Sequence, residues 1–280
     1  MRTSSFHFMR VKHTSIHRWN GRELASAQDV LVEEEPLEIR VRGAAVTVTM
    51  RTPGHDAELA AGFLLSEGII LRRNDVVEIA LCGNAEASSR DNVLNVFLAP
   101  EVRFDEPKAG RLQLTTSSCG LCGKGSIESI HQRFPPIHGD PGRRVAIDRL
   151  LGLPDKLRQR QAAFERTGGL HAAGLFSFGG RRVVVREDIG RHNAVDKVLG
   201  HAFLSGRLPL ANHVLMVSGR VSFEIMQKAL AAQIPLVAAV SAPSSLAVDF
   251  ARESGQTLVG FLRNGGFNVY THEWRLVAAP

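Results

Sequence analysis

The chain has 280 residues, of which 44% are hydrophobic and 22% are charged, and its formal net charge is +6. These values are typical of a soluble globular protein with one large domain or two modest ones, and three cysteines are too few for a disulfide scaffold. The positive charge favours an anionic partner, but scattered Lys and Arg residues, one Tyr and two Trp argue against a nucleic-acid surface.

The N-terminus is basic and lacks the apolar stretch of a secretory signal, so we expect residues 1–20 to form a frayed basic tail. The uncharged stretch from Ala229 to Val248 is interrupted by prolines and serines, which argues against a membrane span. With free cysteines and neither a signal nor a span, the sequence predicts a cytoplasmic protein.

Strands surround one helix in the first half of the chain. We expect this helix to open at Thr52-Pro53, with Thr52 as its cap, and to stop near Gly68. From Ala99 to about Ser126 the regular pattern fades, and a long irregular stretch in a compact protein tends to be functional or mobile. The expected strands are Leu37–Val41 and Ala45–Met50, joined as a hairpin, then Val76–Leu81 and Val93–Leu98, and a short helix is expected over Ser126–Phe134.

Strands and helices alternate in the second half, which predicts a largely parallel sheet with helices on both faces. A helix is expected over Leu153–Thr167, and a hairpin turns at Gly179-Gly180 between Ala172–Phe178 and Arg182–Val185. The other expected helices are Asn193–Leu204, Ser222–Ala232 and Ser245–Glu253, and the other strands are Val214–Val217, Leu236–Val240, Thr257–Leu262 and Asn268–Thr271.

Polar junctions follow four of these strands, at residues 187–193, 218–222, 241–245 and 263–266. In open α/β sheets ligands bind at the carboxyl ends of the strands, and the exposed N–H groups of helix N-termini suit phosphate. Arg191, Arg220 and Arg263 would supply forked contacts. Ser, Asn and Gly also cap helices and make turns in any α/β protein, but four such junctions on one edge favour an anionic, nucleotide-like ligand.

Two of the three cysteines, Cys119 and Cys122, form a Cys-x-x-Cys pair among Gly and Ser residues. Such a pair either reacts or binds a metal. A zinc site needs four ligands. Beyond the Cys-x-x-Cys pair, only Cys82, His131 and His138 are left, and they make a weak second half-site. A zinc deaminase needs a His-x-Glu motif, which no histidine here provides, and a thioredoxin-like pair belongs at an early strand-to-helix junction.

Group transfer is the chemistry that two thiols on an irregular loop suit best. A thiolate accepts sulfane sulfur as a persulfide and delivers it elsewhere, small neighbours let bulky partners approach, and Lys124 favours the thiolate. An incidental pair on a surface loop and a metal-binding or regulatory module stay open as alternatives. Cys82 ends an apolar strand and is expected to be a small buried hydrophobe.

Several long segments between about Glu33 and Thr271 together resemble one family, the FdhD family of sulfur carriers, which formate dehydrogenase needs for its activity. The basic N-terminal tail lies outside this resemblance. The matching segments are Glu34–Ile39, Met50–Asp56, Ser66–Ile70, Thr116–Lys124, Thr167–Ala173, Arg186–Lys197, Ser218–Glu224 and Ser241–Ala247.

The resemblance implies a mixed α/β protein with a cytidine-deaminase-like core, without the deaminase zinc, and with a smaller N-terminal β-rich subdomain. On this basis the chain divides into the basic tail at 1–20, the β-rich subdomain at 21–135 and an α/β cofactor-binding domain at 136–280. A mobile Cys-x-x-Cys loop is expected at about 100–125. The resemblance also implies a homodimer.

The resemblance further implies roles for particular residues. In this family a cysteine desulfurase passes sulfur to a loop cysteine, and the sulfur then goes to the molybdenum of the bis-molybdopterin guanine dinucleotide cofactor before its insertion into formate dehydrogenase. Cys119 falls on the persulfide-forming cysteine and Cys122 on the supporting one. GDP would serve as a fragment of the cofactor, and no resident metal, nucleic acid or membrane partner is expected. The family's cofactor-binding segment falls on Phe261, Leu262, Arg263, Asn264, Gly265 and Gly266.

Overall fold

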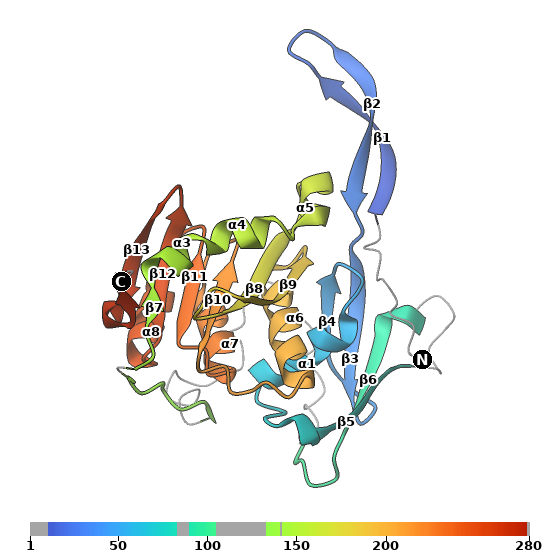
Figure 1. Cartoon of the computed structure of the whole chain (residues 1–280). Coiled ribbons are helices and arrows are strands. Elements are labelled where there is room, and N and C mark those ends of the chain that lie inside the picture. Colours follow the sequence, from blue (N-terminus) through green and yellow to red (C-terminus); the bar gives the residue numbers. More distant parts are fainter. Residues whose placement is uncertain (1–10, 83–89, 105–132, 141, 279–280) are drawn as a thin grey trace.

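The computed structural model describes residues 11–82, 90–104, 133–140 and 142–278 and has a mixed α/β fold (Figure 1). Its larger sheet has six strands in the order β13-β12-β11-β10-β8-β9. Strands β9, β10, β11 and β12 run in one direction, and β8 and β13 run in the other. The strands are β8 (His171–Ser177), β9 (Arg182–Asp188), β10 (His213–Val217), β11 (Leu236–Ala239), β12 (Thr257–Arg263) and β13 (Gly266–Thr271).

The predicted hairpin of β8 and β9 is confirmed, and β10, β11 and β12 are parallel neighbours, as the alternation of strands and helices predicts. The last strand differs, because a tight turn joins β12 to β13 and makes this pair antiparallel. The four strands that share a direction still end at one edge of the sheet, which we call the carboxyl edge.

Helices cover both faces of this sheet, as predicted. Leu215 packs with α6, α7 and α8 on one face, while its neighbours Val214 and Met216 pack with α3 and α4 on the other. No helix in the described part of the chain is long and apolar enough to cross a membrane. The helices are α3 (Ile147–Leu151), α4 (Leu153–Arg158), α6 (Arg191–Leu204), α7 (Phe223–Ala231) and α8 (Ser245–Glu253).

A second sheet, in the order β4-β3-β6-β5, confirms the strands predicted in the first half. Helix α1 (Asp56–Ser66) packs so closely on α6 that a Cβ at Gly62 would collide with the backbone carbonyl of Asp196. One buried core therefore runs through both halves of the chain. The remaining elements are β3 (Glu35–Val41), β4 (Ala44–Arg51), β5 (Val76–Leu81), β6 (Val93–Leu98), β7 (Val145–Ala146), β14 (Leu276–Val277), and the 3-10 turns Arg73–Asp75, Arg90–Asn92 and Glu273–Arg275.

Helix α1 begins at Asp56, so the predicted start at Thr52-Pro53 is wrong. Thr52 is engaged by the segment after β9: its N–H donates to Asp188, and its hydroxyl accepts the N–H of Ile189. Its carbonyl accepts a hydrogen bond from Lys197. The tertiary contact therefore outweighs the local capping signal.

The single helix predicted over residues 153–167 is two helices, α4 and α5 (Ala162–Thr167). The carboxylate of Glu187 on β9 accepts the N–H groups of Ala163 at 3.2 Å and Phe164 at 2.8 Å. A carboxylate that satisfies the free N–H groups of a first turn stabilises a new helix start at that place. The break is therefore set by a residue far away in the sequence.

The frayed tail predicted for residues 1–20 is wrong from residue 11 on. Strand β1 (Val11–Trp19) pairs antiparallel with β2 (Leu24–Val32) over nine residue pairs. The two strands form a ribbon, which we call the arm, that projects from the body and contacts α5 near its base (Figure 1). Sequence reasoning missed the arm because neither strand alternates clearly between apolar and polar residues.

Candidate functional site

The four polar junctions predicted to share one edge do lie side by side at the carboxyl edge. Hydrogen bonds join the first three junctions to one another and the third to the end of β12, which leads into the fourth, so the edge is a continuous surface rather than four separate loops. The links are His192 Nε2 to Ser222 Oγ at 3.1 Å, Val221 N to Ala242 O at 3.1 Å, and Phe261 N to Ser241 O at 3.1 Å.

Positive charge gathers at this edge. His171 begins β8 here, because β8 runs against its neighbours, and Arg191 and Arg220 follow β9 and β10. Burial lowers the pKa of His171, and nearby Arg191, His192 and Arg220 lower it further, so its imidazole is neutral at physiological pH. The Nε of Arg191 is buried without a hydrogen-bond partner among the described residues. An anion at this edge would be stabilised by the arginines.

Two helix N-termini open onto the same surface. Helix α6 follows Gly190 and helix α7 follows Ser222, and in neither does a side chain cap the first turn. Helix α8 differs, because the hydroxyl of Ser244 accepts the N–H of Ala247 at 3.3 Å. Free N–H groups and the positive end of the helix dipole suit a phosphate or another anion.

A histidine–carboxylate pair also lies at this edge. His192 Nε2 is 2.8 Å from Glu224 Oε2, and Glu224 belongs to the first turn of α7. The sequence pattern placed His192 in the junction at 187–193 without a role, and it singled out neither His171, which begins β8, nor Glu224, which follows the junction at 218–222. In the described ranges, no group of three or more His, Cys, Asp or Glu side chains could hold a metal ion.

A buried aspartate fixes the position of the junction after β9. Asp188 is fully buried and lies 2.7 Å from Lys197 Nζ. Its carboxylate also accepts the N–H of Gly190 at 2.8 Å and the amide of Asn193 at 3.2 Å. The backbone N–H of Thr52, in the first half of the chain, donates to the same carboxylate. This contact helps to fix the junction that carries Arg191 and His192.

The predicted cofactor segment 261–266 covers the end of β12, the hairpin turn at Asn264-Gly265 and the first residue of β13. Asn264 and Gly265 both have positive φ, 52° and 75°, and Arg263 pairs with Gly266, which is the pattern of a two-residue type I′ turn. The Asn-Gly pair therefore has a structural role that the sequence already signalled. Arg263 is exposed, whereas the side chain of Leu262 is buried in the core.

The two cysteines of the predicted loop, Cys119 and Cys122, lie outside the described residues. Cys82 is buried, as predicted, with 8% of its surface exposed. The described chain resumes at Arg133, whose guanidinium donates to the carbonyl of Glu67. Pro135 accepts a hydrogen bond from Gln233, which precedes β11, so the chain resumes at the edge opposite the carboxyl edge.

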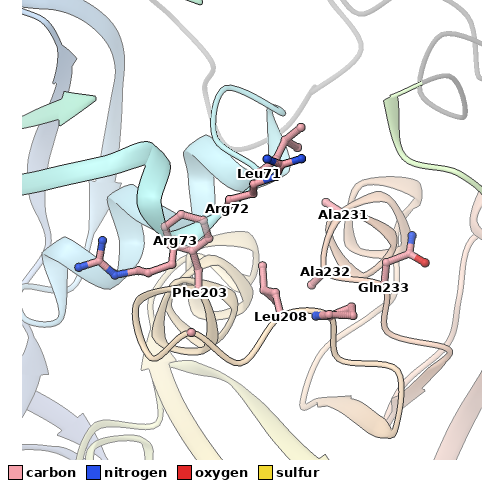
Figure 2. Close-up of a pocket in the computed structure, with 10 residues that line it drawn as sticks. Leu71, Arg72, Arg73, Phe203, Leu208, Ala231, Ala232 and Gln233 are labelled. Atoms are coloured by element: carbon pink, nitrogen blue, oxygen red, sulfur yellow. The ribbon is translucent and has the colours of Figure 1, made fainter. Parts of the chain in front are cut away.

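A pocket of about 350 Å³ also lies at that opposite edge (Figure 2). Apolar side chains such as Phe203 and Leu208 line it together with Arg72 and Arg73. Arg73 is already engaged, because it donates to the carbonyls of Val76 and Leu204. We place the candidate site at the carboxyl edge, since the unpaired donors and open helix ends are there.

Comparison with known sequences assigns the chain to a family. The sequence model of the FdhD/NarQ family matches residues 32–277. The chain belongs to the FdhD/NarQ family. The protein named "Sulfur carrier protein FdhD" from Mycobacterium tuberculosis is 54% identical over 271 residues, covering 94% of this chain and 98% of the relative. The protein of the same name from Streptomyces coelicolor is 53% identical over 250 residues, covering 88% of this chain and 89% of the relative. The family resemblance carried by the motifs is confirmed.

A solved structure shares the fold. The crystal structure described as a formate dehydrogenase accessory protein from Desulfotalea psychrophila superposes with a TM-score of 0.73 at 24% identity, covering 96% of this chain and 99% of that one. At this identity the similarity is evidence for the fold alone.

Proposed function

We propose that this FdhD/NarQ protein is a sulfur carrier that serves formate dehydrogenase. It takes sulfur from a cysteine desulfurase as a persulfide on Cys119 and gives it to the bis-molybdopterin guanine dinucleotide molybdenum cofactor. The support is the name that relatives with more than half identical residues carry, together with a Cys-x-x-Cys pair followed by Lys124. The proposal includes a cytidine-deaminase-like core and a cytoplasmic location, where thiols stay reduced.

A single sulfur transfer balances with the two thiols as its reductant. The Cys119 thiolate attacks the outer sulfur of the desulfurase persulfide, the desulfurase cysteine leaves as a thiolate, and Cys119 becomes the persulfide. The Cys122 thiolate then attacks the inner sulfur of Cys119, which releases sulfide for the metal and leaves a Cys119–Cys122 disulfide. The two electrons that reduce the sulfane sulfur come from the thiol pair, and thiol–disulfide exchange with a cellular dithiol reduces the pair again after each transfer.

The carboxyl edge is the proposed place for the nucleotide end of the cofactor. Arg191, Arg220 and the open N-termini of α6 and α7 suit its diphosphate, and exposed Arg263 stands at the neighbouring turn. Cys119 precedes Arg133 by 14 residues, which span at most about 50 Å when extended. The strands between the two edges are only about 20 Å long, so the thiol is able to reach the cofactor.

Incubation with a cysteine desulfurase and cysteine is expected to add about 32 Da to the peptide that contains Cys119, as each bound sulfur atom does. Intact-protein and peptide mass spectrometry measure this gain, and a thiol reductant should reverse it. The control omits cysteine. A protein whose cysteine peptides gain no sulfur under these conditions would contradict the proposed function.

The nucleotide site has a separate test, binding of GDP as a fragment of the cofactor. Replacing Arg263 by Ala should weaken the binding free energy of GDP by about 1–3 kcal/mol, the usual effect of removing a charged hydrogen-bond donor. Arg252→Ala is the matched control, because this exposed arginine lies in the last turn of α8, away from the carboxyl edge. Isothermal calorimetry measures both variants, and equal affinity of Arg263→Ala and the native protein would remove Arg263 from the site.

A further inference from the structure

The pocket at the edge opposite the carboxyl edge is formed by three separate segments of the chain (Figure 2). Its volume of about 350 Å³ is near the lower end of the range for ligand pockets, roughly 300–1,000 Å³. Its lining is mostly apolar and includes Phe203 and Leu208. The side chains that dominate binding at protein interfaces are seated in small pockets of this kind. The lining residues lie within 71–73, 203–209 and 231–233.

Positive charge surrounds this pocket. Arg72 lines it and is exposed, and the exposed Arg133 lies close by, where its guanidinium donates to the carbonyl of Glu67 at 2.6 Å. Arg73 adds a third positive charge, although its side chain extends away from the α7 side of the pocket (Figure 2). Glu67 and Asp75, the two acids between α1 and β5, already have partners. The surplus of positive charge therefore suits a partner that carries carboxylates.

Described residues on both sides of Cys119 in the sequence lie beside this pocket. Before it, the N–H of Ala99 donates to the carbonyl of Asp75, in the 3-10 turn that borders the pocket. After it, the carbonyl of Pro135 accepts a hydrogen bond at 3.1 Å from Gln233, which lines the pocket. A protein bound in the pocket would therefore stand next to both ends of the segment that carries the reactive cysteine.

We propose that this pocket is the docking site of the cysteine desulfurase, which inserts an apolar side chain while carboxylates beside that side chain pair with Arg72 and Arg133. The inference rests on the proposed function, in which a desulfurase supplies the sulfur. Transfer requires the donor persulfide and the Cys119 thiolate to meet, so the donor must bind where this cysteine can reach it.

Two features of the pocket favour the desulfurase over other partners. The pocket and the carboxyl edge are at opposite ends of the strands, so a donor bound in the pocket leaves the carboxyl edge open to the cofactor. A second copy of the chain, related by a two-fold axis, would set one basic rim against the other, and like charges disfavour that arrangement.

Two substitutions test the docking site. Arg72→Glu reverses a charge at the rim, and Ala231→Phe fills part of the pocket. Each is expected to raise the dissociation constant of the complex with the desulfurase at least about tenfold, and Arg72→Glu should also lower the association rate. Arg149→Glu is the matched control and should leave both constants unchanged, because this exposed arginine lies on α3, which covers the other face of the large sheet. Surface plasmon resonance measures both constants.

A small sulfur donor separates docking from chemistry. Glutathione persulfide gives its outer sulfur to the Cys119 thiolate and leaves as glutathione thiolate, so it needs no docking surface. Mass spectrometry should show that both variants take sulfur from this donor as the native protein does, but more slowly from the desulfurase. Equal affinity of the native protein and both variants for the desulfurase would overturn the docking site and leave the proposed function standing. A native protein that gains no sulfur from either donor would contradict the proposed function and this inference with it.

Other occupants of the pocket would be recognised in the same variants without the desulfurase. A change in oligomeric state, measured by sedimentation velocity, would indicate a second copy of the chain. A lower thermal midpoint would indicate that a segment of the chain's own, within residues 105–132, fills the pocket. Either result with undiminished affinity for the desulfurase would overturn the proposal. Arg72→Glu, at an exposed position, decides alone if Ala231→Phe unfolds the protein.

Discussion

Replacing Cys119 by Ala is expected to abolish activation of formate dehydrogenase while leaving the fold intact. The substitution removes the atom that is proposed to carry the sulfur. The measurement is formate dehydrogenase activity in cells whose native copy of this protein has been replaced by the variant. Circular dichroism of the purified variant separates loss of function from loss of fold.

The other two cysteines provide matched controls for that experiment. Cys122→Ala should reduce activation less, because an external thiol can release sulfur from the Cys119 persulfide in its place. Cys82→Ala should leave activation unchanged, since Cys82 is a buried residue next to β5 with no assigned part in transfer. Full activation by Cys119→Ala would end the proposed mechanism, whatever the controls show.

Local signals in the sequence were sufficient for strands β3 to β6 and β8 to β13 and for the edge at which β9 to β12 end. The hairpin of β3 and β4 and the strands β5 and β6 follow from apolar runs bounded by turn residues. The shared edge of the four junctions follows from chain topology, because β9 to β12 point the same way even where their neighbours do not. Prediction therefore located the candidate site without any knowledge of side-chain contacts.

Features that depend on partners distant in the sequence were not predictable in this way. The carboxylate of Glu187 accepts hydrogen bonds from the first turn of α5, more than twenty residues earlier in the chain. Thr52 donates to Asp188 and does not cap α1, the role that its sequence position had predicted. The His192–Glu224 pair joins two helices that no local pattern places side by side. In each case a polar contact between residues distant in the sequence determines a helix boundary or a side-chain pairing that local helix propensity does not determine.

The Asn264–Gly265 turn shows the opposite case, a local signal of structure that was available in the sequence and was interpreted in terms of a ligand. Asn-Gly between two extended segments is the strongest short-range signal of a hairpin, because both central residues of a type I′ turn need positive φ. The same residues also follow a strand at the carboxyl edge, which favours a ligand-facing junction. The turn accounts for the Gly residues, so the support for a ligand here falls on Arg263 and its charged neighbours.

Replacing Lys228 by Met is expected to lower the free energy of unfolding by about 3–5 kcal/mol, the usual cost of removing one partner from a buried ion pair. Lys228 Nζ lies 2.8 Å from both carboxylate oxygens of Asp196, whose side chain is 3% exposed. Without the ammonium group, the hydroxyl of Ser66, at 3.0 Å, is the one side-chain donor that Asp196 keeps among the described residues. Urea unfolding at neutral pH measures the loss.

The pH dependence identifies the cause of this loss. Burial raises the pKa of Asp196, and Lys228 works against that rise, so the pKa climbs further in the variant. A group whose pKa is higher in the folded than in the unfolded protein favours folding at low pH and loses that contribution as the pH increases through the folded value. The deficit of Lys228→Met should therefore shrink on acidification, and Asp196→Asn added to it should recover part of the stability at neutral pH.

A surface ion pair of the same type provides the comparison. Arg252 and Asp249 lie 3.1 Å apart, but both side chains are about 60% exposed, so Arg252→Met should change stability by less than about 1 kcal/mol. The buried pair matters to the site because Asp196 belongs to α6 and Lys228 to α7, the two helices whose open N-termini form the carboxyl edge. A Lys228→Met variant as stable as the native protein would mean that apolar packing alone holds these helices in register.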